Sequence, residues 1–370
     1  MSESVAFQRI VVKVGASVLT GRGGAPQASR VAMIASQISG CVSQGRHAVL
    51  VSSGAIACGM SALGLKRRPA AIAELQACAA VGQGALMARY SQAFAAHRLT
   101  VAQVLLTQAD VADAARRRNA THTLQALLAR RIVPIVNEND AVAVEEIAFG
   151  DNDRLAALTA SMIGATLVVL LSDVDGLLHQ GAVVGRIDRL DHTHQAMALG
   201  PSRETTTGGM ASKLAAGRIA QHAGIPLVIA NGTKPDVLAR ILSGRPEGTL
   251  IAPPSARLAE KKWWIAFSLR APQGRVVVDA GAAEALLTRG KSLLASGVQS
   301  VEGRFDAGEP VAIVNASGTE LGRGLCEFSA RELSRVRGMK TAEIRQLLGA
   351  KAPSDAVHRD NLVLTRELHV

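Results

Sequence analysis

The chain has 370 residues, and because single hydrophobic cores stop growing at roughly 250–300 residues, we expect two domains. Hydrophobic residues make up 48% of the chain and charged residues 19%, which excludes a disordered or fibrous protein. The formal net charge is +11, but the basic residues are spread along the chain and only 2% of residues are aromatic, which disfavours a nucleic-acid partner bound by base stacking.

The first ten residues lack a basic segment followed by a long apolar run, so no signal peptide is expected. Two uncharged stretches, 47–65 and 155–172, are interrupted by serine and glycine, and neither predicts a membrane span of about 20 apolar residues. The four cysteines are far apart and predict reduced, buried thiols. We therefore expect a cytoplasmic protein without a membrane segment.

In the first 250 residues, short β-branched runs alternate with longer Ala- and Leu-rich segments. The apolar runs predict strands buried on both faces, at Arg9–Val14, His47–Val51, Thr100–Leu106, Ile132–Val136, Thr166–Leu171 and Pro226–Ala230. Helices are expected between them, near residues 27–44, 69–98, 117–131, 152–164, 190–198 and 210–224. This alternation predicts an α/β fold, a mainly parallel sheet sandwiched by helices, with ligands beyond the carboxyl ends of the strands.

After residues 252–254 the segments become shorter and are separated by turns that contain glycine. They predict a small mixed β domain, with strands at Trp263–Leu269, Arg275–Asp279, Ser300–Gly303, Glu309–Val314 and Gly324–Phe328. The domain boundaries that follow are 1–252 for the α/β domain, 253–273 for a linker, 274–352 for the β domain and 353–370 for a C-terminal tail.

The first two strands are followed by loops suited to anions. Lys13 lies at the end of the first strand, where a buried lysine needs an anionic partner, and Gly15 follows it in the turn. The second strand ends in Ser52-Ser53-Gly54. These serines either cap the next helix or offer a hydroxyl to a ligand in the same crevice as Lys13.

The fourth strand is followed by dense polar residues, in N-E-N-D-A-V at 137–142 and G-D-N-D-R-L at 150–155. Either this is a solvated loop or a polar ligand lies there. Asp140 is suited to the ammonium group of an amino acid, and Asn152 can both donate and accept hydrogen bonds. Asp153 could organise lysines or a metal.

The fifth strand ends in Ser172-Asp173, and T-T-T-G-G-M-A-S-K opens a helix at residues 205–213. Hydroxyls, paired glycines and Lys213 at a helix N-terminus favour phosphate binding. Two such loops, each with a lysine, predict a nucleotide as their shared ligand. The P-loop and the G-x-G-x-x-G fingerprints are both absent from the sequence.

Together these loops resemble the amino acid kinase family. The matching segments are V-K-V-G-A-S-V-L at 12–19, S-S-G-A-I-A at 52–57, N-E-N-D-A-V at 137–142, G-D-N-D-R-L at 150–155, S-D-V-D-G-L at 172–177 and T-G-G-M-A-S-K at 207–213. The C-terminal part resembles a PUA domain, in V-V-V-D-A-G-A at 276–282 and A-V-H-R-D-N at 356–361. The resemblance covers nearly the whole chain.

The resemblance is strongest to the members that phosphorylate glutamate. It implies ATP-dependent phosphorylation of the γ-carboxylate of L-glutamate, the first step of proline biosynthesis, with Mg2+ entering with ATP and no metal site assigned to the protein. The implied catalytic residues are Lys13, Lys213 and Asp153, and the implied glutamate site is Ser53, Gly54, Asp140 and Asn152. The implied nucleotide site is Lys13, Gly15, Ser172, Asp173, Thr207, Gly208, Gly209, Met210, Ala211, Ser212 and Lys213.

The family usually has Thr at the position of Ser172 and Tyr at that of Leu178, followed by a longer loop than residues 178–185. Two alternatives remain: another carboxylate or phosphate kinase of this fold, or an RNA-binding PUA protein. The resemblance further implies a homo-oligomer, proline as a feedback inhibitor, and glutamyl phosphate reductase as a partner.

Overall fold

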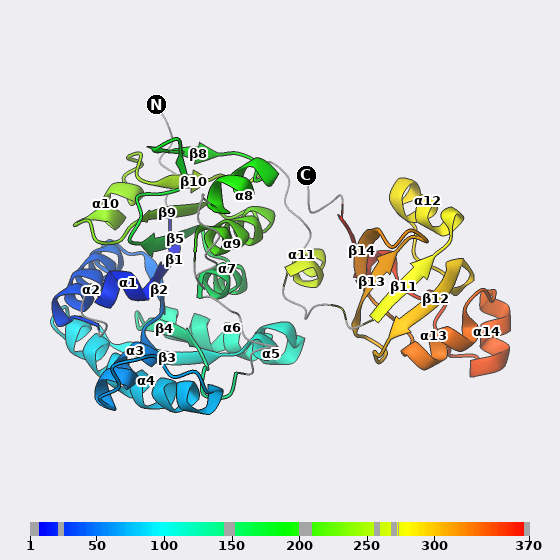
Figure 1. The fold of residues 1–370 in the computed structure, drawn as a ribbon, viewed down its shortest axis with the longest axis horizontal. Coiled ribbons are helices and arrows are strands. Elements are labelled where there is room, and N and C mark those ends of the chain that lie inside the picture. The colour runs from blue at the N-terminus through cyan, green and yellow to red at the C-terminus, as the bar shows by residue number, and fades with distance from the viewer. Residues whose placement is uncertain are drawn as a thin grey trace. The chain divides into compact units, whose positions relative to one another are not determined.

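The computed structural model describes residues 7–20, 26–143, 152–199, 209–254, 260–267, 272 and 274–365. The chain forms two compact units, Met1–Arg257 and Leu258–Val370 (Figure 1). Within the described ranges, no helix combines the length and the apolar character needed to cross a bilayer.

The first unit is built on an eight-stranded sheet with the order β3-β4-β2-β1-β5-β9-β10-β8, which runs from the bottom to the top of this unit in Figure 1. The strands from β3 to β9 are parallel, β10 is antiparallel to β9, and β8 is parallel to β10. The predicted mainly parallel sheet is confirmed. The strands are β1 (Arg9–Val14), β2 (His47–Ser52), β3 (Val101–Leu106), β4 (Val133–Glu138), β5 (Leu167–Ser172), β8 (Arg186–Ile187), β9 (Leu227–Asn231) and β10 (Thr249–Ile251), with a separate hairpin of β6 (Leu178–His179) and β7 (Ala182–Val183).

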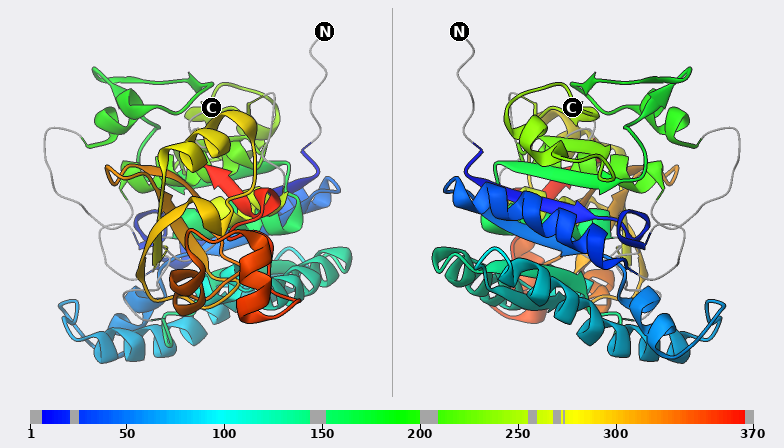
Figure 2. Two further views of the ribbon diagram at one scale, coloured as in Figure 1. Left: turned by 90° about the vertical axis from the view of Figure 1, so that its right-hand side faces the viewer. Right: turned by 90° about the vertical axis from the view of Figure 1, so that its left-hand side faces the viewer.

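Helices cover both faces of this sheet. Ile10, Val12 and Val14 alternate along β1 and join the core beneath α2, α4 and α10, and Figure 2 shows α2 in front of the sheet from that side. The opposite face of β1 packs against α7, which also contacts α9. The helices are α1 (Ala16–Thr20), α2 (Ala28–Ser43), α3 (Ala55–Ala62), α4 (Ile72–Ala95), α5 (Gln108–Ala112), α6 (Ala114–Ala129), α7 (Asn152–Ile163), α8 (His192–Leu199), α9 (Met210–His222) and α10 (Val237–Leu242).

Helices α3 and α4 approach each other backbone to backbone. A Cβ atom at Gly59 would lie 1.8 Å from the carbonyl oxygen of Cys78, and one at Gly82 would lie 1.8 Å from that of Ala55. Because real Cβ atoms do not come so close, only glycine permits this packing. Since α3 follows Ser53 and Gly54 directly, the contact also holds the loop at the end of β2.

We expect Gly82→Ala to lower the free energy of unfolding by roughly 1–3 kcal/mol, because the clash is with backbone that cannot move aside. Gly84→Ala is the matched control on the same helix, since no atom lies within 4 Å of its Cβ position. That control should raise the stability by about 0.5–1 kcal/mol through helix propensity. Urea denaturation measures both, and equal midpoints for the two variants would contradict this account of the packing.

The second unit contains a mixed five-stranded sheet with the order β12-β11-β13-β14-β15. Strands β11 and β13 are parallel and the other pairs are antiparallel, so the predicted mixed β fold is confirmed. Its elements are α11 (Glu260–Phe267), β11 (Gly274–Val278), α12 (Ala280–Arg289), β12 (Val298–Gly303), β13 (Pro310–Val314), β14 (Glu320–Leu325), α13 (Ala330–Val336), α14 (Thr341–Leu348) and β15 (Leu362–Leu364).

The strand predicted at Trp263–Leu269 is wrong, because residues 260–267 form α11; residues 268 and 269 lie outside the described residues. The aromatic residues of this segment led to the prediction of a strand, because aromatic residues are typical of strands. Here Trp263 and Phe267 are one helical turn apart, with ring centroids separated by 5.8 Å. Helix α11 packs against β14 and β15, and Trp263 is buried on it.

The four cysteines are free and buried, as predicted. Burial raises the pKa of the Cys41 and Cys326 thiols to about 11. Both therefore stay protonated near neutral pH and pack as small apolar side chains.

Candidate active site

The parallel register places the ends of four strands side by side at one edge of the first sheet. Val14 at the end of β1 pairs with Ser52 of β2 on one side and with Leu171 of β5 on the other. On β4, Asn137 lies one residue beyond the pair between Val51 and Val136. This edge therefore gathers the predicted loops, as expected for the ligand-binding edge of a parallel sheet.

A buried ion-pair cluster lies at this edge. Asp153, in the first turn of α7, binds the ammonium groups of Lys13 on β1 and Lys213 on α9, with Nζ–O distances of 2.7 Å and 3.1 Å. The aspartate is 0% exposed and each lysine 4%. The structure thus brings together three predicted residues from distant parts of the chain.

The cluster is suited to an anionic ligand. Its three groups together carry one positive charge, and burying charge is costly unless opposite charge is near. Asp153 also lies at the N-terminus of α7, where the helix dipole favours a carboxylate. An anion arriving beside the two ammonium groups would balance the remaining charge in a site that water screens weakly.

Glycine-containing turns border this cluster on two sides. The amide of Gly15 donates to the carbonyl of Leu171 at 3.0 Å, and a Cβ atom at Gly15 would lie 3.9 Å from Nζ of Lys13. On the other side, Gly209 precedes α9 in an extended conformation and gives it no side-chain cap. Met210, Ala211 and Ser212 form the first turn of α9, just before Lys213; the predicted Thr207 and Gly208 lie outside the described residues.

A chain of amide side chains lies at the other end of the site. Nδ2 of Asn152 donates to the backbone oxygen of Ser52 (3.1 Å), to Oγ of Ser53 (2.9 Å) and to Oδ1 of Asn137 (2.9 Å). Nδ2 of Asn137 in turn donates to Oε1 of Gln83 at 3.0 Å. Oδ1 of Asn152 and Nε2 of Gln83 are buried without a hydrogen-bond partner among the described residues. Because buried polar atoms are normally paired, an acceptor and a donor are left for a polar ligand.

Gln83 was missed by the sequence analysis. It lies in the middle of the Ala-rich helix α4, far in sequence from every loop that the motifs singled out, and only its burial marks it. A buried polar residue on an otherwise apolar helix face is the signal that could have found it.

The two serines after β2 play different parts. The buried hydroxyl of Ser52 lies 2.8 Å from that of Tyr90, which is buried on α4. Neither serine caps α3, because Gly54 occupies the cap position with φ +108°, a backbone conformation that favours glycine. Capping, one of the two readings of these serines, is therefore wrong, and Ser53 instead accepts the hydrogen bond from Asn152.

Asp140 lies in the turn that directly follows β4, where it is half-buried. Burial raises the pKa of its carboxyl group, and the nearby Arg68 partly offsets this. A cationic partner would favour its charged form. Asp140 is thus a candidate to bind an ammonium group at the β4 end of the site.

At the end of β5, Oγ of Ser172 donates to the exposed carboxylate of Asp173 at 3.1 Å. The loop then turns at Gly176, which has φ +150°, and the amide of Leu177 donates to the hydroxyl of Thr249 at 2.8 Å. Leu178, where the resemblance implies a tyrosine, is 49% exposed on the β6–β7 hairpin.

Sequence comparisons identify the family to which the chain belongs. A sequence model of the amino acid kinase family matches residues 8–231, and one of the PUA domain matches residues 274–348. The chain belongs to the amino acid kinase family. Lys13, Asp153 and Lys213 all lie within the residues that match this family.

Three relatives within this family match over nearly their whole lengths, and each is named glutamate 5-kinase. The protein from Salinispora arenicola is 47% identical over 97% of this chain and 98% of its own. That from Meiothermus ruber is 46% identical over 98% and 97%, and that from Moorella thermoacetica is 44% identical over 96% of each.

Proposed function

We propose that the chain transfers the γ-phosphoryl group of ATP to the side-chain carboxylate of L-glutamate, forming γ-glutamyl phosphate in the first step of proline biosynthesis. The observation that carries this proposal is the buried cluster in which Asp153 holds Lys13 and Lys213, close to a set of amide and hydroxyl groups suited to an amino acid. Near-full-length similarity to glutamate 5-kinases supports it.

The nucleotide occupies the side of the site between Gly15 and α9. Lys13 and Lys213 contact the phosphates, and the amides that follow Gly15 and those in the first turn of α9 donate to phosphate oxygens. Ser172 and Asp173 border the same side. Bound Mg2+ would neutralise phosphate charge, and it takes most of its ligands from phosphates and water, with Asp173 offering a carboxylate oxygen of the kind it prefers.

Glutamate occupies the side between β2 and β4. The unpaired Oδ1 of Asn152 and the carboxylate of Asp140 accept from the ammonium group. Ser53 and the amides that follow Gly54 at the start of α3 donate to the α-carboxylate. This leaves the side-chain carboxylate directed at the lysine cluster.

The reaction needs no general base. A glutamate side chain has an ordinary pKa of about 4.3, so the attacking oxygen is already charged at neutral pH. Phosphoryl transfer then depends on in-line alignment and on neutralising the oxygens of the transferred group. Lys13 and Lys213 supply that neutralisation, and Asp153 keeps both ammonium groups in place without reorganisation.

We expect Gln83→Leu to raise the KM for glutamate about tenfold and to change kcat little. Without Oε1 of Gln83, the amide of Asn137 loses its acceptor and no longer orients Asn152. Gln92→Leu, an exposed position on α4, is the matched control. Steady-state kinetics measure both, and a fall in kcat at unchanged KM would show that Gln83 does not act through glutamate binding.

Trapping with hydroxylamine tests the proposed function. Purified protein with Mg-ATP, glutamate and hydroxylamine should yield γ-glutamyl hydroxamate, because the amine attacks the acyl phosphate. Omitting either ATP or glutamate should abolish the product. ADP release without hydroxamate would contradict the proposal.

Other properties implied by the resemblance belong to the same proposal. They are a cytoplasmic location, a homo-oligomeric state, feedback inhibition by proline and transfer of the unstable acyl phosphate to glutamyl phosphate reductase. An acyl phosphate hydrolyses readily, which gives direct transfer a chemical advantage.

A further inference from the structure

Tyr90 is buried beside the loop that follows β2, and the proposed reaction gives it no part. It lies on α4 with 0% of its surface exposed, and the centroid of its ring is 6.4 Å from that of Phe94. Its hydroxyl lies 2.8 Å from Oγ of Ser52, the last residue of β2. Burial raises the pKa of the phenol, so the phenol stays protonated and can donate a hydrogen bond.

The direction of the hydrogen bonds at Ser52 follows from its single hydroxyl proton. Oγ of Ser52 donates to the backbone oxygen of Ser53 at 3.0 Å, and this bond uses the proton. In the contact with Tyr90, Ser52 therefore accepts and the phenol donates. The result is a directed chain of two hydrogen bonds, from α4 through Ser52 to the carbonyl of Ser53. Each bond polarises the next, so the two strengthen each other.

This hydroxyl chain orients the peptide group between Ser53 and Gly54. A trans peptide is planar, with its N–H opposite to its C=O, and the described residues contain no cis peptide bond. Because the carbonyl of Ser53 faces the hydroxyl of Ser52, the amide of Gly54 faces away from it. Within the part of the chain that the structure describes, this amide has no hydrogen-bond partner. It is thus a donor directly before the free amides that open α3.

Gly54 cannot hold this orientation by itself. It has φ +108°, and glycine adopts positive and negative φ at similar cost. Without an external hydrogen bond, the peptide group is free to turn over, which would present a carbonyl oxygen in place of the amide. The preceding amide, that of Ser53, is held separately by the carbonyl of Val14 at 3.2 Å. The hydroxyl chain supplies the corresponding support for the next peptide group.

We propose that Tyr90 is a positioning residue for the α-carboxylate of glutamate. It acts through Ser52 and Ser53 and keeps the amide of Gly54 directed at that carboxylate, together with the first amides of α3. The buried phenol does not touch the substrate. This inference rests on the proposed phosphorylation of glutamate and adds how the part of the substrate that does not react is recognised.

Steady-state hydroxamate formation by Tyr90→Phe tests the proposal, because this change removes the hydroxyl and keeps the ring beside Phe94. We expect the KM for glutamate to rise about fivefold, the effect of one hydrogen bond. Both kcat and the KM for ATP should stay within about twofold, since the hydroxyl chain lies on the glutamate side of the site.

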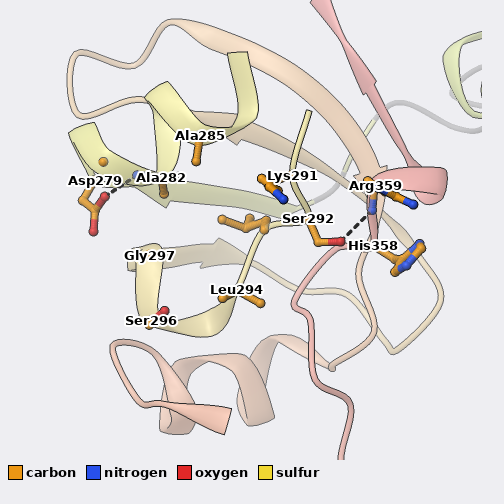
Figure 3. Close-up of a pocket in the computed structure, with 12 residues that line it drawn as sticks. Asp279, Ala282, Ala285, Lys291, Ser292, Leu294, Ser296, Gly297, His358 and Arg359 are labelled. Atoms are coloured by element: carbon orange, nitrogen blue, oxygen red, sulfur yellow. Dashed lines mark hydrogen bonds between the residues drawn. The ribbon is translucent and has the colours of Figure 1, made fainter. Parts of the chain in front are cut away.

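Ser292→Ala is the matched control, because it also removes one hydroxyl that forms a hydrogen bond. Oγ of Ser292 accepts from the amide of Arg359 at 3.0 Å in the second unit, as Figure 3 shows. This variant should leave both KM values unchanged. A rise in the KM for glutamate in Ser292→Ala equal to that in Tyr90→Phe would overturn the proposal.

A substrate without the α-carboxylate separates positioning from a general loss of packing. γ-Aminobutyrate keeps the ammonium group and the reacting carboxylate of glutamate but lacks the α-carboxylate. Tyr90→Phe should therefore leave kcat/KM for γ-aminobutyrate unchanged, measured with the same trapping reaction at high substrate concentration. An equal loss of kcat/KM with both substrates would overturn the proposal, because the phenol would then support the whole site.

A double variant tests the order of the chain. Tyr90→Phe and Ser52→Ala interrupt the same path, so their effects on the KM for glutamate should not add in the double variant, whereas full additivity would contradict the chain. The two proposals fail separately. Absence of hydroxamate with the unmodified protein would contradict phosphorylation of glutamate. Normal hydroxamate formation with an unchanged KM for glutamate in Tyr90→Phe would contradict only the role of Tyr90.

Discussion

Replacing Lys213 by methionine should lower kcat by about 10²–10³-fold while changing the KM for glutamate less than about threefold. The lysine acts on charge that develops during phosphoryl transfer, and removing one such group typically has an effect of this size. The fold should survive, because Asp153 keeps its 2.7 Å ion pair with Lys13.

A coupled assay of ADP formation measures this effect. Arg218→Met is the matched control, since it removes a cation of similar length from the same helix, outside the cluster. Its kcat should remain within about twofold of the unmodified protein. Nearly full activity of Lys213→Met would show that this lysine does not stabilise the transferred phosphoryl group.

Replacing Asp153 by asparagine should have the largest effect on stability. The change leaves two buried ammonium groups without the carboxylate that pairs them, and breaking a buried pair in this way costs about 3–5 kcal/mol. We also expect kcat to fall by at least about 10²-fold, because the two lysines repel each other away from their working positions.

A double variant separates charge repulsion from loss of packing. In Asp153→Asn/Lys213→Met only one buried cation remains, so the double variant should be more stable than Asp153→Asn alone. Urea denaturation of the two single variants and the double variant measures this coupling. Destabilisation equal to the sum of the two single effects would contradict the account of the cluster.

The parallel core was predictable because each central strand is an unbroken apolar run. The predicted Arg9–Val14 coincides with β1, and the other five parallel strands were found within one or two residues. The short strands β8 and β10 were missed, since two- and three-residue strands carry no periodicity that could be read.

The candidate site was predictable where the chemistry lies in loops at strand ends. Lys13 stood out because a lysine at the end of a buried strand needs an anionic partner, and Lys213 because it follows paired glycines at a helix N-terminus. The role of Asp153 came from the family resemblance. Gln83 did not stand out, because its importance arises from a contact with Asn137 across 54 positions in the chain.

Oxygen-isotope transfer provides the most direct measurement. The protein would be given ATP and L-glutamate whose side-chain carboxylate carries oxygen-18, in ordinary water. The amine of γ-glutamyl phosphate then attacks its own acyl carbon and forms a ring. The carbon–oxygen bond breaks, and phosphate leaves with the former carboxylate oxygen. Phosphorus NMR should therefore detect inorganic phosphate that contains one oxygen-18 atom. Phosphate without the label would mean that water, and not the carboxylate, receives the phosphoryl group beside Lys13 and Lys213.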